Sequence, residues 1–245
     1  MKAFGYSDNG MLRAENEDSF ALIPLSSPDD LLAVVCDGMG GAKGGGDAAR
    51  LCADVFKERF SHAAIPERSE LEAALTCAND RVLARAAETG HSRMGTTVVA
   101  AVATPACVSV RWLGDSRAYL WHKGTLQRLT RDHSYVQTLI DEGKIGEEEA
   151  RTHIHRHLIT RAVGVNGEAE GEYRTFSWDA GDRLLLCSDG LSSMVSAREL
   201  CEIMAEDQPP AHTVHELISA ANSHGGEDNI TALVLENTKE TTFDA

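Results

Sequence analysis

Four aspartates stand at the ends of predicted strands that lie far apart in the sequence. They are Asp37 after the apolar residues 31–36, Asp115 after the alternating residues 108–113, Asp189 after residues 183–188, and Asp228 before residues 230–235. A carboxylate at the rim of an apolar core is costly unless a cation or hydrogen-bond donors meet it. One such aspartate is typical of a turn, whereas four predict carboxylates that converge at one rim of a sheet. This predicted group of aspartates is called the acid rim below. Hard divalent cations with oxygen ligands would neutralise that rim.

Glycines follow the first of these acids, at Gly38, Gly40 and Gly41. Because glycine has no Cβ, the backbone can turn sharply here and bring its carbonyls close to a ligand. For this stretch alone, a strand capped by an Asx turn explains the pattern equally well. The recurrence of the strand-end acid is what favours a site.

Two further groups of polar residues invite a chemical interpretation. Arg13 lies beside acids that end at Asp18, and in isolation it is typical of a solvated ion pair. If Asp18 joins the acid rim, Arg13 becomes a planar donor fork that fits a phosphate. His153, His155 and His157 alternate, so on a strand they would share one face. A zinc site is conceivable there, but no cysteine or spaced carboxylate completes a tetrahedral set, which favours a polar flap.

The elements that must position these residues can be predicted from hydrophobic periodicity. Successive strands joined by short turns favour an antiparallel sheet over alternating parallel units. Strands are predicted at residues 2–8, 19–23, 31–36, 94–103, 108–113, 117–121, 125–129, 173–178, 183–188 and 230–235. Helices are predicted at residues 44–60, 69–88, 132–141, 146–150, 191–194, 196–205 and 211–224. The chain therefore alternates groups of strands with pairs of helices, an α+β pattern.

Composition limits the classes of function. The 245 residues are 42% hydrophobic and show no break in composition, which predicts one domain. No apolar stretch approaches the ~20 residues that span a bilayer, and no secretory signal is visible at the start. The six cysteines form no CxxC pair, as expected of free thiols in a reducing compartment. A net charge of −15 argues against nonspecific binding to nucleic acid or anionic membranes.

Eight short motifs in a fixed order carry a family resemblance. They are Arg13-x-x-Asn16-Glu17-Asp18 and the segments 35–41, 94–97, 114–117, 129–134, 159–164, 188–191 and 227–231. In this order they resemble the metal-dependent protein phosphatase family (type 2C Ser/Thr phosphatases) in its compact bacterial form. The resemblance covers residues 5–235, and eight ordered motifs are far more specific than a single Asp-Gly.

The resemblance implies a fold and a cofactor. The expected fold is a central antiparallel β-sandwich flanked by pairs of helices, a four-layer αββα arrangement, with a binuclear Mn²⁺ or Mg²⁺ centre at one end. Residues 1–236 would form the single phosphatase domain, with a flap at about residues 134–160. Residues 237–245 would form a polar tail.

The resemblance also implies a role for each site residue. Asp37 would bridge both metals, and Gly38 would lend its backbone carbonyl to one of them. Asp189 and Asp228 would complete the other metal's ligands, and Asp18 would hold a metal-bound water. Asp115 with Asp189 would hold a third metal, and Arg13 would bind the substrate phosphate. Paired cations would then activate a bridging water for attack on a phosphomonoester, and no cysteine lies in a phosphate loop, which argues against a thiol mechanism.

One position departs from the family pattern. Bacterial relatives commonly carry His after the Asp-Gly-x-Gly-Gly run, whereas this chain has Ala42 followed by Lys43. The general acid is therefore open among Lys43, His133, a flap histidine such as His153, and metal-bound water. We hypothesise a modestly reduced rate on substrates with poor leaving groups, which a comparison of an aryl phosphate with a phosphoserine peptide would test.

The expected partners are phosphorylated Ser/Thr proteins, including a cognate Ser/Thr kinase or its substrates, in the cytoplasm. A monomer is expected, with no nucleic-acid partner and no membrane insertion. The main alternative is a phosphatase-like module that binds phosphoproteins without efficient hydrolysis. Loss of one metal acid would favour that alternative, but Asp18, Asp37, Asp189 and Asp228 are all present. A phosphatase acting on small molecules or phosphohistidine is a further alternative within the enzyme class.

Overall fold

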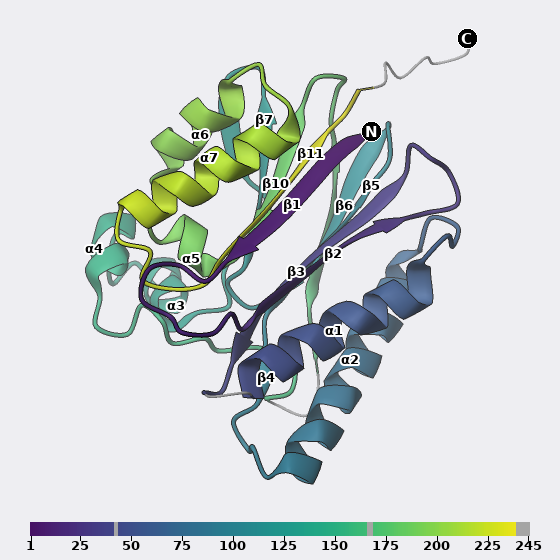
Figure 1. The fold of residues 1–245 in the computed structure, drawn as a ribbon. Helices are drawn as coiled ribbons and strands as arrows, with labels where there is room; N and C mark the ends of the chain where they lie inside the picture. Colours follow the sequence, from purple (N-terminus) through teal and green to yellow (C-terminus); the bar gives the residue numbers. More distant parts are fainter. Residues whose placement is uncertain (42–43, 166–168, 239–245) are drawn as a thin grey trace.

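Two antiparallel sheets face each other in the computed structural model, which describes residues 1–41, 44–165 and 169–238 (Figure 1). The first sheet has the order β1 (Lys2–Asp8), β11 (Ile230–Glu236), β10 (Arg183–Cys187), β7 (Arg117–His122) and β8 (Thr125–Arg128). The second has the order β2 (Asp18–Pro24), β3 (Leu31–Met39), β5 (Val98–Ala103), β6 (Cys107–Leu113) and β9 (Glu172–Ser177), with β4 (Gly95–Thr96) paired to β3. The predicted antiparallel β-sandwich is confirmed.

A pair of helices covers the outer face of each sheet (Figure 1). The pair α1 (Gly44–Phe60) and α2 (Arg68–Thr89) lies over the second sheet, and the pair α6 (Ala197–Ala205) and α7 (Pro210–Ser223) lies over the first. The four-layer αββα arrangement is therefore as expected. None of the described helices has the length and apolar content needed to cross a bilayer.

The uninterrupted apolar runs belong to strands that are buried on both faces. In β3, Val34 and Cys36 belong to the cluster beneath α1, whereas Ala33 and Val35 belong to the cluster between the sheets. The alternation follows from the two-residue period of a strand, which sends neighbouring side chains to opposite faces. In β10, Leu184 and Leu186 likewise face the sandwich interior, while Leu185 and Cys187 face α6 and α7. This double burial carries the strand ends, and the acids beside them, to one end of the sandwich.

The strand before the glycine loop extends further than the sequence predicts. We expected it to end at residue 36, but β3 continues to Met39, with Asp37 opposite Asp18 in β2 and Gly38 opposite Thr96 in β4. A Cβ on Gly38 would lie 2.3 Å from the carbonyl oxygen of Gly45 at the start of α1. Gly38 is therefore required for the close approach of a helix, and pairing with two neighbours keeps the strand extended past the acid.

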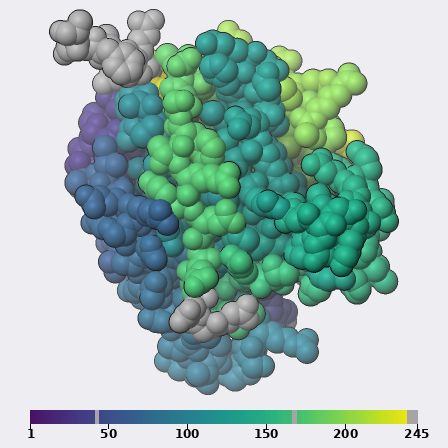
Figure 2. Space-filling view, turned by 180° about the vertical axis from the view of Figure 1, so that it is seen from behind, coloured from purple at the N-terminus to yellow at the C-terminus, as the bar shows by residue number. Residues whose placement is uncertain are grey.

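Residues 134–159 form a separate lobe beside the strands (Figure 2). It contains α3 (Tyr135–Asp141), N-capped by Ser134, and α4 (Glu147–Thr152), and an isolated bridge between Ser134 and Ile159 closes its base. Residues 153–157 form hydrogen-bonded turns after α4, so they do not provide the strand on which the three histidines would share one face.

Candidate metal centre

Acids from both sheets meet at one end of the sandwich. Asp18 and Asp37 lie directly opposite each other at the ends of β2 and β3. Asp189 begins the short helix α5 (Asp189–Ser192) directly after β10, and Asp228 precedes the neighbouring strand β11. Asp115 lies in the turn between β6 and β7, at the same end. The structure therefore brings together all five aspartates that the sequence assigned to the site.

The electrostatics of these carboxylates show how closely they crowd one another. Burial, with repulsion from Asp189 and Asp228, raises the pKa of Asp18 to about 7, although hydrogen bonds from Thr231 and Ser188 oppose the shift. Burial also raises the pKa of Asp37 well above its ordinary range, and Asp18 and Asp189 add to the effect. A carboxyl with a raised pKa is one whose ionised form lacks compensation. The protein alone therefore does not neutralise this rim.

The pKa of Asp115 is raised well above its ordinary range by burial, with repulsion from Asp189 as the next cause. Its Oδ1 atom is buried and has no hydrogen-bond partner among the described residues. Buried polar atoms are almost always paired, so an orphaned carboxylate oxygen points to a cation. The donors gathered here are all oxygens, which is the set that Mn²⁺ and Mg²⁺ prefer. The residues present therefore fit a divalent metal centre.

Hydroxyl groups that the sequence analysis did not single out hold Asp18 in place. Ser188 donates to Asp18 Oδ2 at 2.8 Å, and Thr231 donates to the same oxygen at 2.6 Å. Ser188 also accepts the Thr231 backbone N–H at 2.9 Å, which ties the end of β10 to the start of β11. Both residues belong to the motifs quoted above, but only the pairing of these strands reveals their common partner.

Asn229 is a second residue that sequence reasoning missed. Its side chain accepts the Glu17 backbone N–H at 2.8 Å and donates to the Asn9 and Glu15 carbonyls, each at 3.0 Å. Asn229 is nearly fully buried, so it fastens the loop between β1 and β2 to the rim. The neighbouring residue in the sequence, Asp228, is one of the rim acids.

That loop carries Arg13 to the rim, beside Asp228. Arg13 Nη2 donates to Asp228 Oδ2 at 2.8 Å, while half of the Arg13 side chain stays exposed. Within the described residues, Asp228 is the single partner recorded for this guanidinium. The remaining N–H groups are therefore available to an anion that arrives from solvent.

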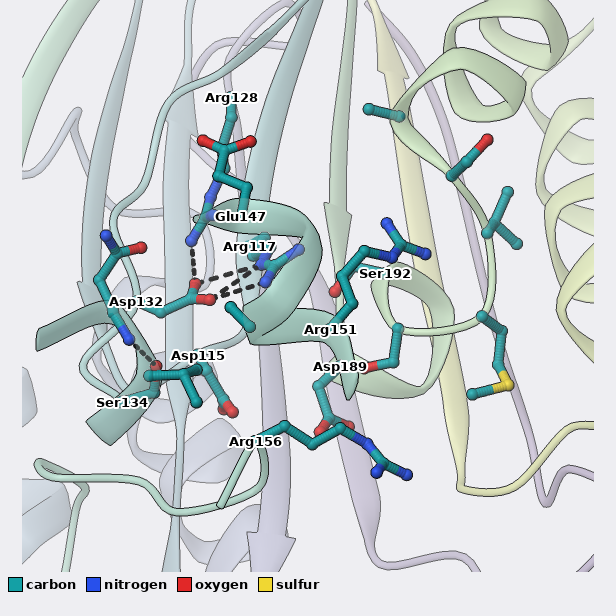
Figure 3. A pocket seen from close by; sticks show the side chains of 18 of the residues that line it. Asp115, Arg117, Arg128, Asp132, Ser134, Glu147, Arg151, Arg156, Asp189 and Ser192 are labelled. Carbon is teal, nitrogen blue, oxygen red and sulfur yellow. Dashed lines mark hydrogen bonds and ion pairs between the residues drawn. The ribbon is translucent and has the colours of Figure 1, made fainter. Parts of the chain in front are cut away.

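A cavity of about 820 Å³ opens beside the rim, between the 134–159 lobe and the first sheet (Figure 3). Asp115 and Asp189 line it, as does a third acid, Asp132. Asp132 differs from the other two because Arg117 donates to it at 2.7 Å and Arg128 forms a second ion pair with it. Among the aspartates of the lining, one is therefore neutralised by arginines and two are not.

The histidines named in the sequence analysis are not brought together. His153 and His155 contact each other, with ring centroids 5.6 Å apart, and both contact the Tyr135 ring. His157 instead lines the cavity, so these three residues do not form the zinc site that was considered. His133 accepts the Gly114 N–H on Nδ1, and its Nε2 lies 3.3 Å from Glu172. Ala42 and Lys43, the other residues relevant to the general acid, lie outside the described residues.

Another group of potential ligands, His122, Asp179 and Asp182, lies at the opposite end of the strands. His122 Nδ1 lies 2.8 Å from Asp182, which also accepts the Asp179 N–H at 2.7 Å, and Lys123 pairs with Asp179. These contacts join two turns, and the group makes no contribution to the acid rim.

The sequence and structure were compared with those of known proteins. The family model for protein phosphatase 2C matches residues 13–232. The serine/threonine phosphatase stp of Listeria monocytogenes is 36% identical over 94% of this chain and 93% of its own length. PstP of Mycobacterium tuberculosis is 37% identical over 94% of this chain, which corresponds to 44% of PstP.

Solved structures of serine/threonine phosphatases are similar to this structure as well. The S. agalactiae serine/threonine phosphatase superposes with a TM-score of 0.89 at 28% identity, over 96% of this chain and 99% of that one. The catalytic domain of PstP in complex with two manganese ions gives a TM-score of 0.86 at 34% identity, over 97% and 98%. Because the family model matches residues 13–232 and these relatives cover 94% or more of the chain, the chain belongs to the protein phosphatase 2C family of metal-dependent serine/threonine phosphatases.

Proposed function

We propose that the acid rim is the catalytic centre at which this metal-dependent phosphatase hydrolyses phosphoserine and phosphothreonine in proteins. The observation that carries the proposal is the convergence of five aspartates, four of which have pKa values raised by burial. Among the described residues, Arg13 is the one arginine that forms an ion pair with any of the five. Relatives named as serine/threonine phosphatases, one of them with two manganese ions bound, support it.

Asp37 is proposed as the ligand shared by two cations, because Asp18, Asp189, Asp115 and Asp228 all act on its carboxyl group. We assign Asp189 and Asp228 to one cation, and the Gly38 carbonyl to the other. Asp18 would orient water at the centre, and Asp115 with Asp189 would hold a third ion. When bound, paired Mn²⁺ or Mg²⁺ ions supply a hydroxide at neutral pH and neutralise charge on the phosphoryl group.

Arg13 is proposed as the residue that binds the substrate phosphate. Asp228 fixes one end of its guanidinium at 2.8 Å, so the orientation of the fork is set before substrate arrives. Asn229 holds the loop that carries it. A planar fork of fixed orientation can donate two parallel hydrogen bonds to phosphoryl oxygens, which positions the phosphorus for in-line attack.

We further propose that residues 1–236 act as one domain and that residues 134–160 act as a flap beside the catalytic centre. The cavity between this segment and the first sheet supports the second assignment. The physiological role we propose is to oppose a Ser/Thr kinase in the cytoplasm, by dephosphorylating the kinase or its substrates. The extreme C-terminus, predicted as a polar tail, lies largely outside the described residues.

The decisive experiment measures phosphate release from a phosphoserine peptide, with and without Mn²⁺, for the wild type and Asp189→Asn. We expect Mn²⁺-dependent release by the wild type and its loss in the variant. The alternative, a module that binds phosphoproteins without hydrolysing them, would be favoured if the wild type bound the peptide but released no phosphate at any Mn²⁺ concentration.

A further inference from the structure

The cavity beside the rim extends well beyond the acids that would hold metal. Its walls come from the flap helix α4, the short helix α5 and the start of α6, as well as from β7 and β8 (Figure 3). A volume of about 820 Å³ is in the range of sites that enclose a ligand of several residues. The substrate phosphate needs only the end next to Asp115 and Asp189, so most of the cavity is left for another part of the substrate.

The arginines that line this cavity differ in whether they form an ion pair with a carboxylate of the protein. Arg117 and Arg128 pair with Asp132, Arg156 lies 3.6 Å from Glu227, and Arg198 pairs with Glu202. These four side chains are therefore neutralised by carboxylates of the protein itself.

Arg151, on α4, is the remaining arginine of the lining, and it has no ion pair with any carboxylate of the described residues. Glu147 and Glu148 precede it in the same helix, but neither is within ion-pair distance of it. The N–H donors of its guanidinium therefore have no anionic partner among the described residues, whereas each of the other arginines of the cavity pairs with a carboxylate.

Ser192 is the second unsatisfied donor in the same cavity. It is only 5% exposed, and its Oγ atom is buried without a hydrogen-bond partner among the described residues. Buried hydroxyls are normally paired, so this one awaits a partner from the cavity. Ser192 lies three residues after Asp189 in α5, which places the two side chains on the same face of the helix about 5–6 Å apart. Figure 3 shows Arg151, Ser192 and Asp189 together in the cavity lining.

We propose that Arg151 and Ser192 form a subsite for a second anionic side chain of the substrate, close in sequence to the phosphoserine that is cleaved. The proposal rests on the proposed function. The anion is either a carboxylate or a further phosphate, because both accept hydrogen bonds from a guanidinium fork and a hydroxyl. Since each residue of an extended peptide spans about 3.3–3.6 Å, an anion near Ser192 belongs to a residue about one to three positions from the phosphoserine.

The test compares phosphoserine peptides that differ only near the phosphoserine that is cleaved: neutral flanks, one Asp placed at each of three positions on either side, or a second phosphoserine at the same positions. The measured quantity is the ratio of kcat/KM for each anionic peptide to that for the neutral peptide, at fixed ionic strength. We expect a ratio of about five- to tenfold for the preferred position, as for one charge-assisted hydrogen bond in a partly exposed site. Preference for Asp or for the second phosphate identifies which anion the subsite takes.

Variants then assign the preference to these residues. Arg151→Gln and Ser192→Ala should each bring the ratio toward one, whereas Arg59→Gln, at an exposed position on α1 away from the cavity, should leave it unchanged. Because the measured quantity is a ratio, general damage to the metal centre lowers kcat/KM for both peptides and leaves the ratio unchanged.

The possible failures are distinct. Equal kcat/KM for anionic and neutral peptides in the wild type, or a ratio that survives in both variants, would overturn the subsite and leave the proposed function standing. A wild type that hydrolyses none of the peptides with Mn²⁺ would overturn the proposed function, and the subsite with it.

Discussion

Buried aspartates that line the same cavity differ in whether arginines form ion pairs with them. Asp132 receives two guanidinium groups, from Arg117 and Arg128, within the first sheet and its adjoining loop. Asp115 and Asp189 form no ion pair with an arginine in the described part of the chain. Burial raises the pKa of each of them, although the charge of Arg117 opposes the shift. An acid that the protein neutralises contributes to the fold, whereas an acid left without compensation costs stability unless something else arrives. The difference separates structural acids from the proposed metal centre without reference to any bound ion.

The opposite end of the sandwich supports the same distinction. There Asp182 accepts the Asp179 backbone N–H and contacts His122, so its oxygens are satisfied by the chain. Proximity of potential ligands is therefore a weaker guide to a metal site than the absence of internal partners.

The largest expected effect concerns catalysis. Asp189→Asn should lower Mn²⁺-dependent phosphate release by more than about a hundredfold, because even residues that only support a metal ligand cost 10–100-fold when removed. Mn²⁺ binding measured by calorimetry should weaken in parallel. Retention of both tight Mn²⁺ binding and activity would erase the distinction drawn between the two groups of acids.

Substitutions at the two kinds of aspartate should change the free energy of unfolding of the metal-free protein in opposite directions. Asp132→Asn should destabilise the metal-free protein by about 2–3 kcal/mol, since it strands two partly buried guanidinium groups, with some loss to solvent screening. Asp37→Asn should stabilise the metal-free protein, because it removes a carboxylate that its neighbours repel. Urea unfolding in the presence of a chelator measures both. If Asp37→Asn proved the more destabilising of the two, the comparison would fail.

The pH dependence of stability should carry the signature of the crowded rim. The pKa of Asp18 is about 7 in the folded protein, above its ordinary value near 4, so the folded state binds the extra proton. That contribution to stability is complete below about pH 4 and is lost as the pH rises through about 7. The metal-free wild type should therefore lose stability relative to Asp18→Asn between pH 5 and pH 8. Parallel unfolding curves across this window would show that Asp18 is compensated after all.

A smaller effect is expected at the hydroxyls that support the rim. Ser188→Ala removes one of two donors to Asp18 Oδ2 and should weaken Mn²⁺ binding by about tenfold. Ser193→Ala, at an exposed position one residue after α5, serves as the matched control and should bind Mn²⁺ as the wild type does. An equal loss in the two variants would indicate a general disturbance of α5 rather than support of Asp18.

Much of the fold could be predicted from local patterns. The continuous apolar run before Asp37 predicted a doubly buried strand, and the helices at 44–60 and 211–224 followed from their apolar stripes. A prediction failed where contacts between segments decide the backbone. The strand β3 continues past Asp37 because β2 and β4 both pair with it there.

The sequence by itself determined which residues could form the site: aspartates at strand ends, a neighbouring arginine and glycines that permit close approach. Only the tertiary structure decided which of those acids lack a partner, because Asp115 and Asp132 look equally polar in the sequence. Through the pairing of β7 with β8, Arg117 and Arg128 form ion pairs with Asp132 and none with Asp115. Compensation of a buried charge depends on distances between segments that are remote in the chain, and local sequence carries no record of those distances.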